Sequence, residues 1–367
     1  MIYKAIGVMS GSSADGLDVV YVPFHEKGGK WEYYLEAAEC FSYPPALLSQ
    51  LKQIPHLDAL SYKRLDVAMG KFIGECILAF VEKYGLHYRV DLIGSHGHTG
   101  FHRPAEGWSD QLGNGAVIAA MTGLPVVTEL RMLDVSLGGQ GAPIVPVGEK
   151  YLFPGYSWFL NIGGIANLSF HGATTSIAFD VCPANQILNR LAMLRHQPYD
   201  RDGELAARGH VQKPLLERLN ALPYYAMPFP KSLANEWVAT EVWPLLETAE
   251  ISPEDRLATY CTHIALQVAR AIELTQQQVA EARGPASLLV TGGGAFHRYL
   301  VSCIQEMLRP LEIRVVVPDA ETVKFKEALI MAFLGVRRWR EESTTLASVT
   351  GAKYDGIGGA LWIGHQP

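Results

Sequence analysis

The sequence predicts an α/β fold divided into two domains, and three observations support this prediction. First, the chain has 367 residues, whereas a single hydrophobic core usually stops growing at roughly 250 to 300 residues. Second, segments with the pattern of strands alternate with segments of helical periodicity. Third, the order of strand, turn and strand at the N-terminus recurs near the middle of the chain, which indicates a weak internal duplication.

The first domain is expected over residues 1–146. Two short apolar segments, Tyr3–Met9 and Leu17–Phe24, predict strands joined by the loop over residues 10–16. Residues 61–85 carry apolar side chains at helical spacing, and they predict a long helix with one buried face. The remaining elements are two strands and a helix between them, at residues 90–94, 125–128 and 116–121. Their alternation predicts a sheet covered by helices.

The second domain is expected over residues 147–367, with a terminal helix that could pack back across the hinge. Three strand segments open it, separated by a glycine turn at Gly163 and Gly164. These strands are expected at residues 158–160, 165–170 and 176–179. Helices follow at 185–195 and 256–282, then a last strand at 287–291 and the terminal helix at 326–340.

Composition restricts the class of partner. With 49% hydrophobic and 19% charged residues, the chain is typical of an ordered globular protein. A net charge of −6 provides no cationic surface for nucleic acid or anionic lipid, so we expect a small-molecule partner, no nucleic acid and no membrane. Five cysteines without a CxxC pair, and an N-terminus that reads as a strand and not as a signal peptide, predict a cytoplasmic protein.

The loop SGSSADG over residues 10–16 is the first candidate for binding an anion. Its two glycines allow successive backbone N–H groups to converge on a phosphate, and a nearby carboxylate can hold hydrated Mg²⁺. The loop lacks the GK[ST] ending of a Walker motif and the GxGxxG pattern of a dinucleotide fold. An ordinary hairpin loop is the alternative.

Two further positions could carry chemistry. The segment Gly292–Gly294 follows a predicted strand and precedes a helix predicted from about Phe296, so it could receive a nucleotide against the free N–H groups of the helix start. Close packing of strand on helix also requires glycine. Asp180 follows the predicted strand that ends at Phe179, where it could accept a proton from an attacking hydroxyl or water; a capping aspartate is the alternative.

The histidines in SHGHTGFHRP suggest a metal site less strongly than polar contacts to a hydroxylated ligand. His96 and His98 share one side of an extended segment, and His102 follows them, but no Cys or acidic ligand accompanies them at a recognised spacing. The glycines in residues 138–143, GGQGAP, could form a flexible crossing between the domains.

Taken together, these motifs closely resemble the anhydro-N-acetylmuramic acid kinases. The similarity extends over nearly the whole chain, with the motifs in family order and at family spacing. The motifs are GVMSGSSADGLD at 7–18, SHGHTGFHRP at 95–104, LDVSLGGQGAPIVP at 133–146, LNIGGIANLSF at 160–170, FDVCPAN at 179–185, YDRDGELAARG at 199–209, PFPKS at 228–232, TGGGAF at 291–296 and SVTGA at 348–352.

The resemblance implies an actin-like, ribonuclease H-like ATPase fold, with ATP and an anhydro sugar in an interdomain cleft, and a homodimer. It implies ATP and Mg²⁺ as cofactors. Asp180 matches the family's catalytic base, which activates water to attack the anomeric carbon while the released O6 takes the γ-phosphoryl group. The stretch that matches the family's ATP-phosphate segment consists of Gly11, Ser12, Ser13, Ala14, Asp15, Gly16, Leu17 and Asp18, and the nucleotide-side turn consists of Gly292, Gly293 and Gly294.

Mg²⁺ is expected on the ATP phosphates, with Asp18 as a ligand through water. The expected sugar contacts are His98, Arg131, Asp134 and Glu327, for which interdomain pairing or capping is the alternative role.

The chain departs from the usual family pattern DTGPGN, which reads DVCPAN at residues 180–185. Two rival functions therefore stay open. One is a kinase for another anhydro sugar such as levoglucosan. The other is a sugar- or nucleotide-binding regulator without turnover.

Overall fold

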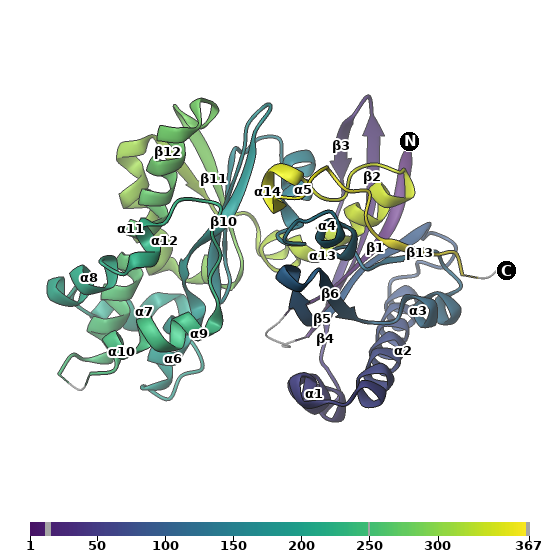
Figure 1. Cartoon of the computed structure of the whole chain (residues 1–367), viewed down its shortest axis with the longest axis horizontal. Helices are drawn as coiled ribbons and strands as arrows, with labels where there is room; N and C mark the ends of the chain where they lie inside the picture. The colour runs from purple at the N-terminus through teal and green to yellow at the C-terminus, as the bar shows by residue number, and fades with distance from the viewer. Residues whose placement is uncertain (12–15, 249, 365–367) are drawn as a thin grey trace. The chain divides into compact units, whose positions relative to one another are not determined.

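The computed structural model describes residues 1–11, 16–248 and 250–364, and the chain forms two compact units (Figure 1). Unit 1 comprises Met1–Pro154 and Phe325–Pro367, and unit 2 comprises Gly155–Lys324. The sequence-based boundary was residue 146, with the terminal segment assigned to the second domain and its helix allowed to pack back across the hinge. The contacts instead divide the chain after residue 154 and join the terminal segment to unit 1. In Figure 1, the purple N-terminal strands and the yellow C-terminal segment accordingly lie in the same unit.

Unit 1 contains a mixed sheet in the order β13-β7-β5-β1-β2-β3, in which β4 also pairs with β2 and β6 with β5. Strand β1 runs antiparallel to β2 and parallel to β5, and β5 runs parallel to β7. The strands are β1 (Ile2–Ser10), β2 (Leu17–Lys27), β3 (Lys30–Tyr33), β4 (Ala37–Phe41), β5 (Leu92–Arg103), β6 (Trp108–Leu112), β7 (Val126–Thr128) and β13 (Ala360–Trp362).

The helices of unit 1 bury apolar faces. The second helix begins after Asp58, whose carboxylate accepts the Ser61 N–H at 2.8 Å as an N-cap. Its residues Met69, Ile73 and Ile77 are fully buried in the core. The helices are α1 (Pro45–Lys52), α2 (Ala59–Lys83), α3 (Gly115–Thr122), α4 (Met132–Ser136), α5 (Val145–Leu152), α13 (Ala320–Trp339, which begins before the division) and α14 (Ala347–Thr350).

Helix α13 explains why the C-terminal segment belongs to unit 1. A Cβ atom on Gly7 of β1 would meet the backbone carbonyl of Ala328, and one on Gly94 of β5 would meet that of Met331. Glycine at these two positions lets the helix backbone approach the sheet directly. Periodicity predicts the helix itself but does not identify the sheet against which it packs.

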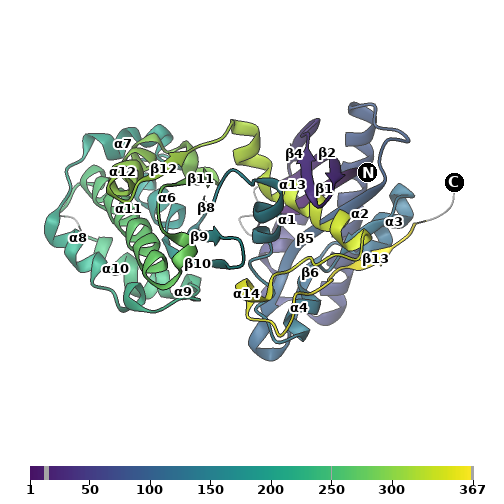
Figure 2. The ribbon, with the colours of Figure 1, turned by 90° about the horizontal axis from the view of Figure 1, so that it is seen from above.

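Unit 2 contains a five-stranded sheet in the order β10-β9-β8-β11-β12 (Figure 2). Strands β8, β9 and β10 form antiparallel pairs, while β11 runs parallel to both β8 and β12. The strands are β8 (Trp158–Ile162), β9 (Ile165–His171), β10 (Ser176–Pro183), β11 (Ala286–Thr291) and β12 (Ile313–Val316). The helices are α6 (Asn185–Met193), α7 (Glu204–Arg208), α8 (Lys213–Asn220), α9 (Asn235–Trp237), α10 (Trp243–Leu246), α11 (Pro253–Gln278) and α12 (Arg298–Leu308).

The two units share one topology. The path β3-β2-β1-β5-β7 in unit 1 corresponds to β10-β9-β8-β11-β12 in unit 2. In unit 1, β1 pairs antiparallel with β2 on one side and parallel with β5 on the other, and β5 runs parallel to β7. In unit 2, β8 pairs antiparallel with β9 on one side and parallel with β11 on the other, and β11 runs parallel to β12. This repeated order is that of a ribonuclease H-like unit. The predicted internal duplication and the predicted fold class of two such α/β units are therefore confirmed.

Three expectations about the elements were wrong. Strand β10 continues to Pro183 and does not stop at Phe179, so Asp180 lies inside the strand at a register shift between Asp180 and Cys182. Among the described strands, β10 pairs with β9 alone, and as an edge strand it tolerates both the bulge and the proline. Strand β11 is not the last strand, because β12 and β13 follow it. Residues 138–143 lie within unit 1 and do not cross between the units.

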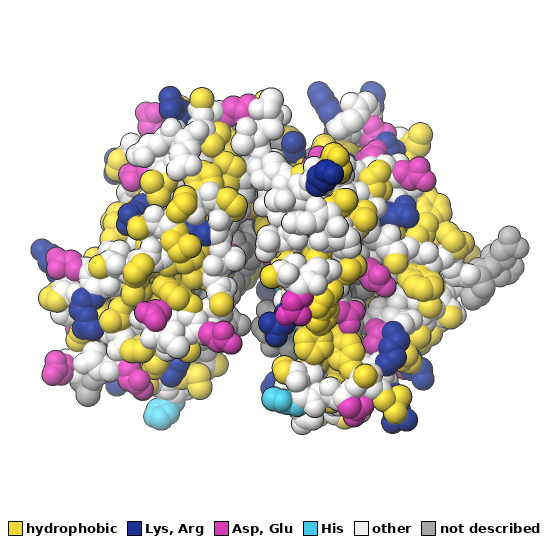
Figure 3. Space-filling model, in the orientation of Figure 1, with side chains coloured by type: hydrophobic (Ala, Val, Ile, Leu, Met, Phe, Trp, Pro, Cys, Tyr) yellow, Lys and Arg dark blue, Asp and Glu magenta, His cyan; other side chains and the backbone are white. Residues whose placement is uncertain are grey.

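On the face that Figure 3 shows, Lys and Arg side chains are interspersed with Asp and Glu. The residues drawn in colour form no strongly charged patch on this face. Among the described residues, no helix is both long enough and apolar enough to cross a bilayer.

Candidate active site

Asp180 is the centre of the candidate site in unit 2. The Asn167 side-chain amide donates to its Oδ1 at 3.0 Å, and the Leu233 backbone N–H donates to its Oδ2 at 2.9 Å. Burial raises the pKa of the Asp180 carboxyl above its ordinary value, while these two donors act in the opposite direction. Both carboxylate oxygens are thus oriented by neutral donors. This environment is suited to a group that takes up and releases a proton.

A cross-strand row connects Asp180 to the glycine turn. Asp180 on β10 pairs with Asn167 on β9, Asn167 pairs with Asn161 on β8, and Asn161 pairs with Thr291 on β11. The Asn161 amide donates to Asn167 Oδ1 at 3.3 Å. Because paired residues share one face of a sheet, the four polar side chains lie at one level. Asp180 and the turn that follows Thr291 therefore lie on the same side of unit 2.

The predicted nucleotide turn begins with Gly292, which has a φ of 80°. A Cβ atom at this position would meet Asn161 Oδ1 and the Ile162 carbonyl, so only glycine fits both the conformation and the space. The 3-10 helix η7 (Gly293–Phe296) follows, and then α12. The turn places the glycine backbone next to the Asn161 end of the row, at the start of a helical segment, which is where a nucleotide-binding turn lies.

The segment 224–233 holds Asp180 from its other side. The Tyr224 hydroxyl donates to the Asp180 carbonyl at 2.8 Å, and the Asp180 N–H donates to the Lys231 carbonyl at 3.0 Å. The Phe229 ring stacks on Phe179, with centroids 5.1 Å apart and planes 8° apart. The PFPKS motif thus packs on the strand that carries Asp180 and is hydrogen-bonded to it. The sequence alone did not indicate that Phe229 of this motif stacks on Phe179.

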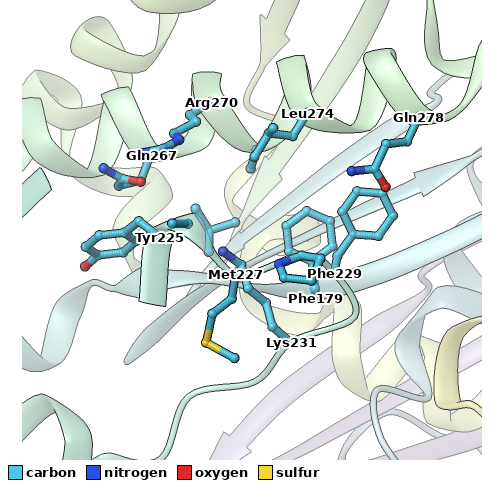
Figure 4. Close-up of a pocket in the computed structure, with 13 residues that line it drawn as sticks. Phe179, Tyr225, Met227, Phe229, Lys231, Gln267, Arg270, Leu274 and Gln278 are labelled. Atoms are coloured by element: carbon cyan, nitrogen blue, oxygen red, sulfur yellow. The ribbon is translucent and has the colours of Figure 1, made fainter. Parts of the chain in front are cut away.

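A cavity of about 150 Å³ lies between this segment and α11. Figure 4 shows Gln267, Arg270, Leu274 and Gln278 of α11 on one side, and the Phe179–Phe229 pair on the other. Phe179 and Val181 line the cavity, but Asp180 between them does not. The cavity therefore lies behind the strand that carries the candidate base, not in front of the carboxylate.

Unit 1 carries the other candidates, beginning with the N-terminal loop. Ser12, Ser13, Ala14 and Asp15 lie outside the described residues. Gly11 follows β1, and Gly16 precedes β2, where a Cβ atom would meet Cys40 Sγ. The Leu17 side chain is fully buried in the core, so only its backbone could contact a phosphate. Asp18 is half-buried near the start of β2. A carboxylate there is the oxygen ligand type that hydrated Mg²⁺ accepts.

Arg131 and Glu327 lie close together in unit 1. Burial lowers the pKa of Arg131 to about 10, and the charge of Glu327 partly opposes this shift. The Arg131 Nε atom is buried and has no hydrogen-bond partner among the described residues. Burial, and secondly the charge of Arg131, lower the pKa of His96 to about 3, so that imidazole is neutral at physiological pH. The group offers one desolvated cation, which would attract an anion more strongly than an exposed one.

Asp134 has a different environment. Its Oδ2 accepts the Gly141 N–H at 2.8 Å, and its Oδ1 accepts the Thr350 hydroxyl at 2.8 Å. The residue is 1% exposed. Its carboxylate thus links the GGQGAP segment to the SVTGA segment within unit 1 through two hydrogen bonds. These contacts correspond to the alternative, structural role considered for Asp134, and the sugar contact stays a prediction.

Within the described part of the chain, the histidine segment does not belong to a metal-binding cluster. Among the described residues, no group of three or more His, Cys, Asp or Glu side chains could hold a metal ion. His96 Nδ1 donates to the Gly97 carbonyl at 3.0 Å, and His98 Nδ1 lies 2.8 Å from Ser10 Oγ. One nitrogen of each ring is therefore already engaged by the protein.

Comparison with known proteins adds a family to this geometry. The sequence model of the family described as anhydro-N-acetylmuramic acid kinase matches residues 3–364. The chain belongs to this family. An anhydro-N-acetylmuramic acid kinase of Shewanella woodyi (strain ATCC 51908 / MS32) is 32% identical over 372 residues, covering 97% of this chain and 98% of the relative. One of Coxiella burnetii (strain Dugway 5J108-111) is 32% identical over 389 residues, covering 99% and 98%.

Membership of this family of sugar kinases accounts for the order of the motifs along the chain. Two solved structures of lower sequence identity also match the chain. The activator of the 2-hydroxyisocaproyl-CoA dehydratase from Clostridium difficile with bound ADPNP is 14% identical, with a TM-score of 0.46 and coverage of 92% of this chain and 96% of that one. Component A of the (R)-2-hydroxyglutaryl-CoA dehydratase of Acidaminococcus fermentans is 16% identical, with the same TM-score and coverage of 92% and 98%.

Sequence reasoning named Asp180 and the glycine turn but missed Asn161 and Asn167. Both belong to the LNIGGIANLSF motif, where each asparagine interrupts an apolar strand. The sequence signal that could have identified them is a polar residue at matching positions on the two strands of a predicted hairpin.

Proposed function

We propose that this chain opens 1,6-anhydro-N-acetylmuramic acid by hydrolysis and phosphorylates O6 with ATP, giving N-acetylmuramic acid 6-phosphate. Family membership supports the substrate class. The observation that carries the chemistry is the half-buried, doubly hydrogen-bonded carboxylate of Asp180, beside a glycine turn that suits a nucleotide.

In the proposed reaction, Asp180 takes a proton from water as the water oxygen bonds to the anomeric carbon. The bond between that carbon and O6 breaks, and O6 bonds to the γ-phosphorus as ADP leaves. Asn167 and the Leu233 N–H keep the Asp180 carboxylate oriented. Phosphoryl transfer depends mainly on positioning and charge neutralisation. Mg²⁺, when bound, neutralises the phosphates; Asp18, through water, and the phosphates themselves would hold it.

Arg131 supports a substrate that carries a carboxylate. Muramic acid has a lactyl carboxylate, whereas levoglucosan has none. A desolvated guanidinium interacts strongly with an anion because the local dielectric is low. We therefore favour the muramic substrate over levoglucosan, with Arg131 as its carboxylate ligand and with Glu327 and His98 among its other contacts.

The altered residues 181–184 do not by themselves favour a regulator without turnover. Cys182 and Ala184 are fully buried in the core of unit 2. Burial raises the pKa of the Cys182 thiol above its ordinary value, so the side chain stays neutral. The Asp180 carboxylate retains both donors beside them.

Turnover in ¹⁸O-water with ATP and a panel of anhydro sugars tests the proposal. We expect the muramic substrate to yield a product that has gained one water and one phosphate, with ¹⁸O at the anomeric carbon. Phosphorylation of levoglucosan in preference would favour the rival kinase, and sugar binding without product would favour the regulator. Light scattering of the purified chain tests the expected homodimer.

Asn167→Ala should change the pH dependence of this reaction. Loss of the amide donor removes an interaction that lowers the pKa of Asp180, so this pKa should rise further. A general base acts in its ionised form, and the rate therefore falls as pH drops through its pKa. We expect the acidic limb of the kcat/KM profile to move to higher pH. Asn189→Ala, on an exposed position of α6, is the matched control. Superimposable profiles would contradict the role of Asn167.

A further inference from the structure

A buried chain of hydroxyl groups ends on His98. The Tyr43 hydroxyl donates to Ser10 Oγ at 2.5 Å, and Ser10 Oγ lies 2.8 Å from His98 Nδ1. The exposed fractions are 8% for Tyr43, 2% for Ser10 and 5% for His98. These contacts are short and shielded from water, so they order the three side chains strongly.

The fold of unit 1 brings the three residues together. Ser10 is the last residue of β1, and it pairs with His98 on the adjacent parallel strand β5. Tyr43 follows β4 and precedes α1, and its ring lies against Phe72 of α2 with centroids 5.4 Å apart. Three segments that are distant in the sequence thus meet beside the start of the N-terminal glycine loop.

Counting hydrogens determines the direction of the chain. The Tyr43 hydroxyl uses its hydrogen as a donor to Ser10, so Ser10 must donate its own single hydrogen elsewhere. Within the described part of the chain, His98 Nδ1 is an acceptor within hydrogen-bonding distance of Ser10 Oγ. Burial lowers the pKa of His98, so the ring is neutral at physiological pH. A neutral imidazole that accepts at Nδ1 carries its proton on Nε2.

We infer that Tyr43 and Ser10 are positioning residues that hold His98 as the Nε2–H tautomer, so that His98 donates a hydrogen bond to an acceptor oxygen of the sugar. The identity of the acceptor rests on the proposed function, whereas the tautomer does not. A protonated Nε2 has no lone pair for a metal or for a proton. His98 is therefore neither a metal ligand nor a general base through this atom.

The first test is independent of activity. Two-bond ¹H–¹⁵N correlation spectra of the free protein report which nitrogen of each histidine carries the proton, and His98→Gln assigns the His98 signals. We expect Nε2 at the shift of a protonated nitrogen and Nδ1 at that of an unprotonated one. Ser10→Ala should move both shifts toward a mixture of tautomers, while Tyr62→Phe, which removes a hydroxyl bonded to Asp110 instead, should leave them unchanged. A proton on Nδ1 in the wild-type protein overturns the inference.

The second test separates positioning from general stability. Loss of one hydrogen bond in the chain should raise the KM for the sugar about three- to tenfold, with a smaller change in kcat. We expect this for Tyr43→Phe and Ser10→Ala, and partial recovery for Ser10→Thr, which restores a hydroxyl. An unchanged KM in both variants contradicts the sugar contact. If the wild-type protein phosphorylates no anhydro sugar, the proposed function fails, and the spectra still decide the tautomer.

Discussion

Asp180→Asn is expected to lower kcat by about 10²- to 10⁴-fold, which is the contribution of a positioned general base. Asparagine has nearly the same size as aspartate, and its carbonyl oxygen can still accept one of the two donors that now orient the carboxylate. It cannot accept a proton from water at neutral pH. The KM values for ATP and sugar should therefore change little. Steady-state kinetics with ADP release as the readout, together with binding of both substrates by calorimetry, measure the two effects separately.

Asp202→Asn is the matched control for this variant. Asp202 also lies in unit 2, but its side chain is 43% exposed and 3.3 Å from the exposed Arg298. Its φ of 55° suits asparagine as well as aspartate. We expect kcat close to that of the wild-type protein. If Asp180→Asn retained wild-type turnover in the same assay, the assignment of the base would be wrong.

Lys326→Met is expected to lower the free energy of unfolding of unit 1 by about 3 to 5 kcal/mol, which is the usual effect of removing one partner of a buried ion pair. Lys326 Nζ on α13 lies 2.7 Å from Glu149 Oε1 on α5, and the two side chains are 2% and 4% exposed. Removing the cation takes an opposite charge and a hydrogen-bond donor away from the buried Glu149 carboxylate. Urea unfolding followed by circular dichroism measures the change.

Lys83→Met provides the comparison, because Lys83 pairs with Glu39 at 2.8 Å but its side chain is 56% exposed. Exposed pairs contribute at most about 1 kcal/mol, so this variant should unfold almost as the wild-type protein does. The double variant Lys326→Met with Glu149→Met should regain much of the lost stability, because no uncompensated charge stays buried. Equal destabilisation by the two single lysine variants would contradict the prediction.

The fold class was predictable because it depends on local patterns. The apolar periodicity of residues 61–85 reflects the buried face of α2, and the two hairpins reflect the repeated topology of the sheets. Boundaries were less predictable, because they depend on contacts between distant segments. The sequence allowed a terminal helix that packs back across the hinge, but nothing near residue 325 identifies Gly7 and Gly94 of unit 1 as the positions on which α13 packs.

The candidate site shows the same division. The recurrence of family motifs was enough to point to Asp180 and the glycine turn. The donors that act on Asp180 could not be found in this way, because Asn167 and Leu233 reach it across a strand pair and from a distant loop. The extension of β10 past Asp180 was missed because an edge strand accepts a bulge that apolar alternation does not reveal.

The sequence by itself determined the alternation of elements, the family, and the types of residue that could perform proton and phosphoryl transfer, because these depend on the order and chemical identity of neighbours along the chain. Only the tertiary structure decided which atoms meet: the amides that orient Asp180, the two hydrogen bonds by which Asp134 links residues 138–143 to residues 348–352, and the hydroxyl chain that ends on His98. Hydrogen bonds act over about 3 Å. They therefore depend on the strand register and packing that the whole chain produces, and no local segment specifies them.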